Sequence, residues 1–246
     1  MIINQNNKSK SRFILSVSES VNSFKIILRS KYFYIGLISI LAGYGLNFTS
    51  QIYLLHCINE GKTLPVLSDL ILDRLPYYDI SLIYDIFYLT GIVVVLIYWV
   101  HKKDYERIPL FLILCGILFL VRGVFIVLSP FGNPPMFRGS NMFKAFEGIE
   151  VGVYPSGHTG SLFLLFLMVK DKWYKQIILF CLCIVIISLC FSRGHYSIDI
   201  FSGIIFTYAI YVFGEKHLKM FDLGNRNNPE DLKHPKIMGS LLIAEN

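Results

Sequence analysis

The chain has 246 residues, of which 54% are hydrophobic and only 16% are charged. Because soluble domains carry about 25% charged residues, this composition excludes a disordered chain, a coiled coil and an ordinary cytosolic enzyme. The formal net charge of +6 follows from Lys and Arg residues beside apolar runs, so it does not indicate a nucleic-acid partner. The five cysteines form no CxxC pair and no zinc spacing, and we interpret them as packing residues.

Six apolar runs follow one another along the chain. They lie at residues 33–55, 81–100, 108–130, 158–170, 174–192 and 195–214. Most have the roughly 20 residues that a helix needs to cross about 30 Å of hydrocarbon, and the fourth is shorter. We therefore predict an all-α, polytopic membrane protein. Its six transmembrane helices form one domain over residues 33–214, between polar segments at 1–32 and 215–246.

Lys and Arg residues predict the orientation of these helices, because they concentrate in cytoplasmic loops. Seventeen lie in the N-terminal segment, the C-terminal tail and the loops at 101–107 and 170–175, whereas four lie in the loops at 56–80 and 131–157. We expect both termini in the cytoplasm and those last two loops on the exoplasmic or periplasmic side. The N-terminal segment has no compact apolar core followed by a small-residue cleavage site, so we expect no cleaved signal peptide.

Ionisable side chains inside apolar runs are costly and by default mark a functional site. Here they are Asp85, Arg122, His158, Arg193, His195 and Asp199. All six fall in the half of their runs that the charge bias places on the exoplasmic side. Arg122 lies eight residues before Pro130, or roughly 12 Å along a helix, which is too deep for easy contact with headgroups. Asp85 is a candidate ion-pair partner for it.

Two short segments contain most of these residues. The first is Tyr-Pro-Ser-Gly-His-Thr-Gly at 154–160, and the second is Ser-Arg-Gly-His-Tyr-Ser-Ile-Asp at 192–199. His195 and Asp199 are four residues apart, so on a helix they share one face. The carboxylate can then bind one imidazole nitrogen and leave the other free, which is the base-and-orienter half of a nucleophilic site.

Both segments also open a predicted helix. Helix N-termini favour phosphate because they present unpaired amides and the positive end of the helix dipole. Ser156 and Gly157 suit a cap in the first segment, and Arg193 and Arg122 are candidates to bind phosphate oxygens. These parts predict a phosphoryl-transfer site with one nucleophilic histidine, one acidic histidine and one aspartate.

The same residues admit other interpretations. The spacing of His195 and Asp199 is also that of a simple polar pair, and Arg193 is also placed to extend toward the lipid headgroups. Two histidines and an aspartate are a possible metal-ligand set. The Ser-Gly-His segment has no ligand spacing, however, so we predict no metal and no other cofactor.

The two segments resemble motifs of the type 2 phosphatidic acid phosphatase superfamily. The form of the second, His-Tyr-Ser-x-Asp-Ile, is more similar to the sphingomyelin synthase branch. Residues 64–69, with Asp73 and Pro76 after them, resemble the first conserved loop of that branch. Arg107 and Arg122, followed by Val-Leu-Ser-Pro at 127–130, resemble its arginine-bearing third helix. The similarity spans residues 33–214.

The resemblance implies a six-helix fold with cytoplasmic termini and a metal-independent, two-step mechanism. By motif position, His195 attacks the lipid phosphorus and carries a phosphohistidine, and Asp199 orients and charge-balances it. His158 protonates the leaving lipid alcohol and then activates the acceptor hydroxyl. The acceptor is water in a phosphatase and a lipid hydroxyl in a synthase. We expect Asp69 and Asp85 to support this site.

The chain departs from both branches. The synthase branch has Cys-Gly-Asp before its Ser-Gly-His-Thr, where this chain has Val-Gly-Val-Tyr-Pro at 151–155, and Pro155 is the phosphatase-type residue. The phosphatase branch places its Ser-Arg well ahead of the nucleophilic histidine, whereas only Gly194 intervenes here. A lysine-led first phosphatase motif is not evident. The chain thus combines features of the two branches.

We predict an integral membrane lipid phosphotransferase that moves a phospho-head group between lipids on the non-cytoplasmic face. Its partners are a membrane phospholipid, a lipid-hydroxyl or water acceptor and the bilayer. Hydrolysis of phosphatidate or an isoprenyl pyrophosphate is the second interpretation, because the same histidine chemistry serves both and water exclusion decides between them. A transporter that uses Asp85, Arg122 and His195 is disfavoured by the absence of repeated halves, and a non-catalytic lipid-binding scaffold by the complete set of motif residues.

Overall fold

The computed structural model describes residues 25, 27–138 and 151–224, and this part of the chain is helical and contains no strand. Its α-helices are α2 (Lys31–Asn59), α3 (Ser81–Lys102), α4 (Ile108–Leu128), α5 (Gly157–Met168), α6 (Lys172–Phe191) and α7 (Ser197–His217). Its short 3-10 helices are η1 (Leu72–Arg74), η2 (Tyr105–Arg107) and η4 (Lys219–Phe221). Each apolar run corresponds to one α-helix, so the predicted all-α fold is confirmed.

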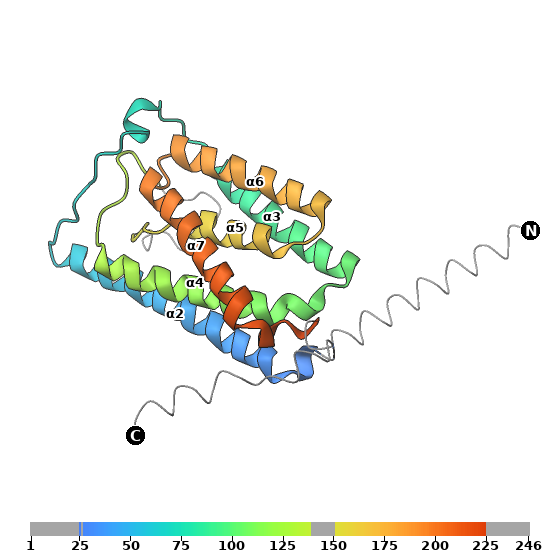
Figure 1. Cartoon of the computed structure of the whole chain (residues 1–246). Helices are drawn as coiled ribbons and strands as arrows, with labels where there is room; N and C mark the ends of the chain where they lie inside the picture. Colours follow the sequence, from blue (N-terminus) through green and yellow to red (C-terminus); the bar gives the residue numbers. More distant parts are fainter. Residues whose placement is uncertain (1–24, 26, 139–150, 225–246) are drawn as a thin grey trace, which may run out of the picture.

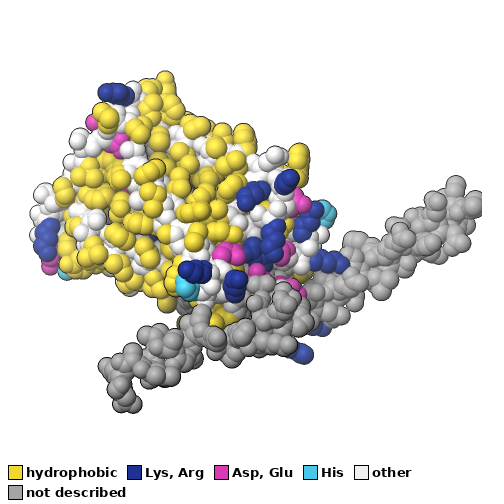
Figure 2. All heavy atoms as spheres, viewed as in Figure 1, with side chains coloured by type: hydrophobic (Ala, Val, Ile, Leu, Met, Phe, Trp, Pro, Cys, Tyr) yellow, Lys and Arg dark blue, Asp and Glu magenta, His cyan; other side chains and the backbone are white. Residues whose placement is uncertain are grey.

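Five of the helices, all but α5, are long and apolar enough to cross a membrane. Figure 2 shows a broad hydrophobic surface over the bundle, with charged side chains gathered toward its ends. The chain is therefore a multi-pass membrane protein. Helix α5 has only 12 residues, or about 18 Å of length, which is less than the roughly 30 Å of a bilayer core. The sixth membrane crossing, and the orientation of the termini, stay predictions.

Helices α2 and α4 lie side by side along most of their length, and α3 and α6 form a second pair (Figure 1). Glycines allow the first pair to pack backbone against backbone: a Cβ atom built on Gly43 would lie 2.4 Å from the carbonyl oxygen of Gly116. A Cβ atom built on Gly123 would lie 3.0 Å from the backbone nitrogen of Asn47. Small residues are what close packing of membrane helices requires. This contact sets the position of α2 relative to α4.

The short helix α5 lies inside the bundle, between the two pairs (Figure 1). On one side Leu162 joins a core cluster that includes Ile178 and Val185 of α6. On the other side Leu164 joins a cluster that includes Leu114 of α4 and other side chains of α4 and α7. Because apolar contacts hold α5 from both sides, its N-terminus is fixed at the centre of one end of the bundle.

At the opposite end, the buried Arg107 links three helices. Its Nε donates to Asp222 Oδ2 at 3.1 Å, its Nη1 donates to the carbonyl oxygen of Met168 at 3.1 Å, and its Nη2 donates to Glu215 Oε1. Phe221 also packs edge-on against Tyr32 at 5.3 Å. Helix α7 thus continues beyond residue 214 and packs on the bundle. The domain boundary predicted at residue 214 stays a prediction. Residues 225–246 of the predicted tail lie outside the described residues.

Candidate active site

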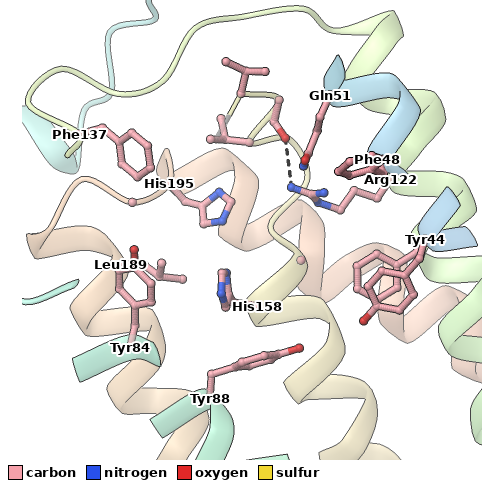
Figure 3. A pocket seen from close by; sticks show the side chains of 16 residues that line it. Tyr44, Phe48, Gln51, Tyr84, Tyr88, Arg122, Phe137, His158, Leu189 and His195 are labelled. Carbon is pink, nitrogen blue, oxygen red and sulfur yellow. Dashed lines mark hydrogen bonds between the residues drawn. The ribbon is translucent and has the colours of Figure 1, made fainter. Parts of the chain in front are cut away.

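A cavity of about 330 Å³ opens at the end of the bundle where the loop at 60–80 and the described residues 129–138 and 151–156 lie (Figure 3). Six of its 16 lining residues are Phe or Tyr. Its lining includes Tyr44 and Phe48 of α2, Tyr84 and Tyr88 of α3, and Phe119 of α4. The polar residues that line it are Gln51, Arg122, His158 and His195. It combines an apolar enclosure with a few convergent polar groups, as small-molecule sites do.

His195 precedes α7, and Asp199 lies in the first turn of that helix. The two atoms His195 Nδ1 and Asp199 Oδ2 are 3.2 Å apart, and the carboxylate is fully buried. Asp199 Oδ2 also accepts the backbone N–H of Tyr196 at 2.9 Å, as part of a capping box. We assign the Nδ1 proton to the bond with the carboxylate, because a carboxylate only accepts. Nε2 then keeps its lone pair.

His158 lies in the first turn of α5 and faces His195 across the cavity (Figure 3). The centroids of the two imidazole rings are 6.3 Å apart. Tyr88 and Tyr84 hold the His158 ring by edge contacts at 4.9 and 5.5 Å between centroids. Tyr88 is held in turn by the Ser161 hydroxyl, which donates to its oxygen at 3.1 Å. The structure thus brings the histidines of the two predicted motifs together.

Arg122 reaches the same cavity from α4. Its Nε donates to the carbonyl oxygen of Pro155 at 2.9 Å and its Nη2 to that of Gly152 at 3.1 Å, while Nη1 donates to Asn47 Oδ1. These three hydrogen bonds go to acceptors other than Asp85, which is buried in α3 and is not part of the cavity lining. A guanidinium has five N–H groups, so two of them make no hydrogen bond within the described part of the chain.

The Ser-Gly pair caps α5, as the sequence predicts. Ser156 Oγ accepts the backbone N–H of Thr159 at 3.4 Å and donates to Thr159 Oγ1 at 3.1 Å. Its hydroxyl is therefore committed to the helix. Gly157 lines the cavity, and a Cβ atom there would lie 3.3 Å from Arg122 Nε. The missing side chain lets the guanidinium approach the helix N-terminus.

Arg193 does not join the other predicted residues. Its backbone has a left-handed conformation with φ of 57°, and its Nη2 donates to the carbonyl oxygen of Leu75 at 2.9 Å. It is not part of the cavity lining. The left-handed residue turns its side chain toward the loop that follows α2, and its assignment to the substrate phosphate stays a prediction.

Asp69 holds that loop against the start of α7. Its carboxylate accepts the backbone N–H of Ser197 at 2.6 Å and the Ser197 hydroxyl at 3.0 Å. It also accepts the backbone N–H groups of Ile71 and Leu72, both at 3.0 Å. Burial alone raises the pKa of Asp69, but these hydrogen bonds outweigh burial and hold the pKa below its usual value.

Tyr196 adds a second attachment. Its hydroxyl accepts the backbone N–H of Leu67 and donates to the carbonyl oxygen of Asn133, both at 3.2 Å. Both neighbours of Gly194-His195 therefore bind the loop that follows α2: Arg193 on one side, and Tyr196 with Ser197 on the other. Asp69 does not line the cavity, and it acts on His195 only through the backbone N–H and hydroxyl of Ser197.

Sequence reasoning missed the contribution of α2. The sequence pattern alone assigns no role to Asn47 or Gln51. The available signal was their spacing, because two amides four residues apart in an apolar helix share one face. The aromatic lining residues carried no such signal, since Tyr and Phe are frequent throughout this chain.

Residues 154–216 match the family model described as PAP2 superfamily C-terminal. The match contains His158, His195 and Asp199, the three residues that converge here. The match supports an assignment of this segment to the PAP2 superfamily. Members of this superfamily are phosphatases and phosphotransferases, and the match does not distinguish the sphingomyelin synthase-like branch from the others. No curated protein matches the chain.

Proposed function

We propose that this protein is a membrane lipid phosphotransferase that moves a phospho-head group from a lipid donor to a lipid hydroxyl through a phosphohistidine on His195. One observation carries the proposal: the buried His195–Asp199 pair faces His158 across a cavity that also contains Arg122. Nucleophile, orienting carboxylate, acid and cation are the parts that phosphoryl transfer requires. The PAP2 superfamily match supports the same class of reaction.

In the first step, His195 Nε2 attacks the phosphorus of the bound lipid. The bond between phosphorus and the ester oxygen breaks, and its electron pair goes to that oxygen. His158 donates the proton that makes this leaving group a neutral alcohol. Asp199 holds the Nδ1 proton of His195 and balances the positive charge that the ring gains.

In the second step, His158 accepts the proton of the acceptor hydroxyl, and the acceptor oxygen attacks the phosphorus. The nitrogen–phosphorus bond breaks and its electron pair returns to His195. Arg122 and the N-terminus of α5 stabilise the phosphoryl oxygens in both steps. The enzyme ends in its starting protonation state, so neither step needs a cofactor.

The aromatic walls favour a lipid acceptor over water. Apolar side chains exclude water from the acceptor position. Tyr44 and Phe48 bring the apolar lining up to Arg122 (Figure 3), and Phe119 lines the same cavity. The loops at this end of the bundle contain few Lys and Arg residues. We therefore place the reaction on the non-cytoplasmic face.

The test uses the purified full chain in mixed micelles with labelled phospholipids, with and without diacylglycerol or ceramide. A new phospholipid that forms only when the acceptor is present, and that disappears in His195→Ala, is the expected result. The matched control is His56→Ala, because His56 is an exposed histidine in the last turn of α2 and is not part of the cavity lining. Free phosphate released by the wild type and not by His195→Ala assigns hydrolysis instead. Equal behaviour of wild type and His195→Ala on every lipid rejects the catalytic proposal.

A further inference from the structure

The phosphoryl group in the proposed reaction needs more side-chain hydrogen-bond donors than the predicted residues supply. A phosphoryl group in transfer spreads negative charge over three equatorial oxygens. Arg193 binds Leu75 outside the cavity, and the Ser156 hydroxyl is committed to Thr159. Arg122 has two N–H groups left after its bonds to Asn47, Pro155 and Gly152. The side chains assigned from the sequence therefore leave the charge only partly bound.

Gln51 of α2 lies where a further donor is needed. It lines the cavity, and Figure 3 shows its amide beside the guanidinium of Arg122. Within the described part of the chain, no hydrogen bond ties this amide to another residue. Asn47, one helical turn earlier, is buried, and its Oδ1 accepts from Arg122. The two amides share a helix face, and they differ in that Asn47 holds the arginine whereas Gln51 is free to bind substrate.

We propose that Gln51 is a catalytic residue whose side-chain NH2 group donates to a non-bridging phosphoryl oxygen held by Arg122. The amide contributes donors without adding a formal charge. It is held in place because the helix that carries it packs on α4 through Gly43 and Gly116. This inference rests on the proposed function and names a substrate-binding residue outside the segment that matches the family model.

The test compares Gln51→Leu and Gln51→Glu with the wild type by two readouts. The first is kcat/KM on the lipid that the wild type consumes. The second is inhibition by inorganic vanadate, which binds a nucleophile as a five-coordinate adduct and presents the same three equatorial oxygens. Loss of one such donor reduces catalysis by about a hundredfold in well-buried sites. We expect at least about a tenfold loss in kcat/KM and in vanadate affinity for Gln51→Leu, because Gln51 is only partly buried.

Gln51→Glu should lose more than Gln51→Leu in both readouts, because a carboxylate repels the phosphoryl oxygens. Gln176→Leu is the matched control, since Gln176 is an exposed glutamine on α6 far from the cavity lining, and it should behave as the wild type. The two Gln51 variants are nearly the same size as glutamine. The thermal midpoint of each purified variant shows whether that variant is folded. The values of kcat/KM and vanadate affinity are then compared only for folded variants.

The outcomes separate this inference from the function on which it rests. If His195→Ala abolishes vanadate binding but Gln51→Leu and Gln51→Glu bind vanadate as the wild type does, Gln51 is not a phosphoryl ligand and the proposed function stands. If only the KM for lipid changes, Gln51 contacts another part of the lipid and the inference is wrong. If the wild type shows neither turnover nor vanadate binding that depends on His195, the proposed function fails and this inference fails with it.

Discussion

Asn47 is the residue through which α2 acts on Arg122. A buried guanidinium that loses an acceptor keeps an unsatisfied N–H group, which costs about 1–3 kcal/mol. Arg122 spans three parts of the chain, since it also binds the carbonyl oxygens of Gly152 and Pro155. The amide of Asn47 is thus a positioning group for the guanidinium of Arg122.

Substitution of Asn47 separates stability from activity. Asn47→Leu should lower the thermal midpoint and reduce kcat/KM, because Arg122 loses a partner. Asn47→Asp keeps the acceptor and adds a charge, so the midpoint should stay near that of the wild type. Its kcat/KM should still fall by about tenfold, because the introduced carboxylate forms an ion pair with the guanidinium and competes there with the substrate phosphate. An Asn47→Asp variant with full activity would show that Arg122 does not bind the phosphate.

At the scale of elements, the contact between α2 and α4 decides where the polar face of α2 lies. Gly43 and Gly116 bring the two backbones together, and Asn47 follows Gly43 by one helical turn. The residues that α2 buries include Gly36, Gly43, Asn47, Ser50 and Leu54, which recur at intervals of three, four or seven along one stripe. The rest of α2 faces outward, where Ile38 and Leu41 are exposed.

A methyl group at Gly43 should therefore damage the site from a distance. The added Cβ meets the backbone of Gly116 at 2.4 Å, and backbone cannot move aside cheaply, so overpacking should cost about 1–3 kcal/mol. Gly43→Ala should lower both the thermal midpoint and kcat/KM, because α2 and Asn47 move away from Arg122. Gly45→Ala is the control, since a Cβ atom there meets nothing within 4 Å. Equal effects of the two substitutions would contradict this account of the contact.

The start of α7 depends on the loop that follows α2. Asp69, Tyr196 and Arg193 connect residues that are more than 115 positions apart in the chain. The loop thereby holds both flanks of His195, while the capping box of Tyr196 and Asp199 organises the helix itself. Helix α5 brings His158 to the same place because two apolar clusters hold it in the centre of the bundle.

For the whole molecule, Asp69 makes stability depend on pH. Its pKa in the folded protein is held below the ordinary value, which is about 3.9 for an unfolded chain. The stabilisation is therefore fully present above that ordinary value, and it is lost as the pH falls from there through the lowered pKa of the folded state. The substitution Asp69→Asn removes the stabilisation by the carboxylate at every pH.

The thermal midpoints of wild type and Asp69→Asn in detergent should differ by a constant amount from pH 7 to about pH 5. The difference should correspond to about 1–3 kcal/mol, because the amide leaves part of the Ser197 cap unbound. Below about pH 4 the two midpoints should converge, as Asp69 takes up a proton in the wild type. A gap that widens on acidification would mean that the carboxylate is not the stabilising form.

The positions of the helices could be predicted from the sequence, because an apolar run of sufficient length must satisfy its backbone hydrogen bonds internally wherever it lies in a membrane. The pairing of His195 with Asp199, and the cap at Ser156, were likewise predictable, since both depend on contacts within one turn of helix. The family resemblance of residues 154–160 and 192–199 depended on the same local pattern.

Only the tertiary structure decided which distant residues meet. The left-handed backbone of Arg193 directs its side chain to Leu75, although its place in the sequence beside His195 favoured the phosphate. Asn47 and Gln51 reach Arg122 because glycines let α2 and α4 approach closely, and no local pattern encodes that approach. Local hydrogen bonding and hydrophobicity determine each helix by itself, whereas the side chains that share a cavity follow from how the helices pack.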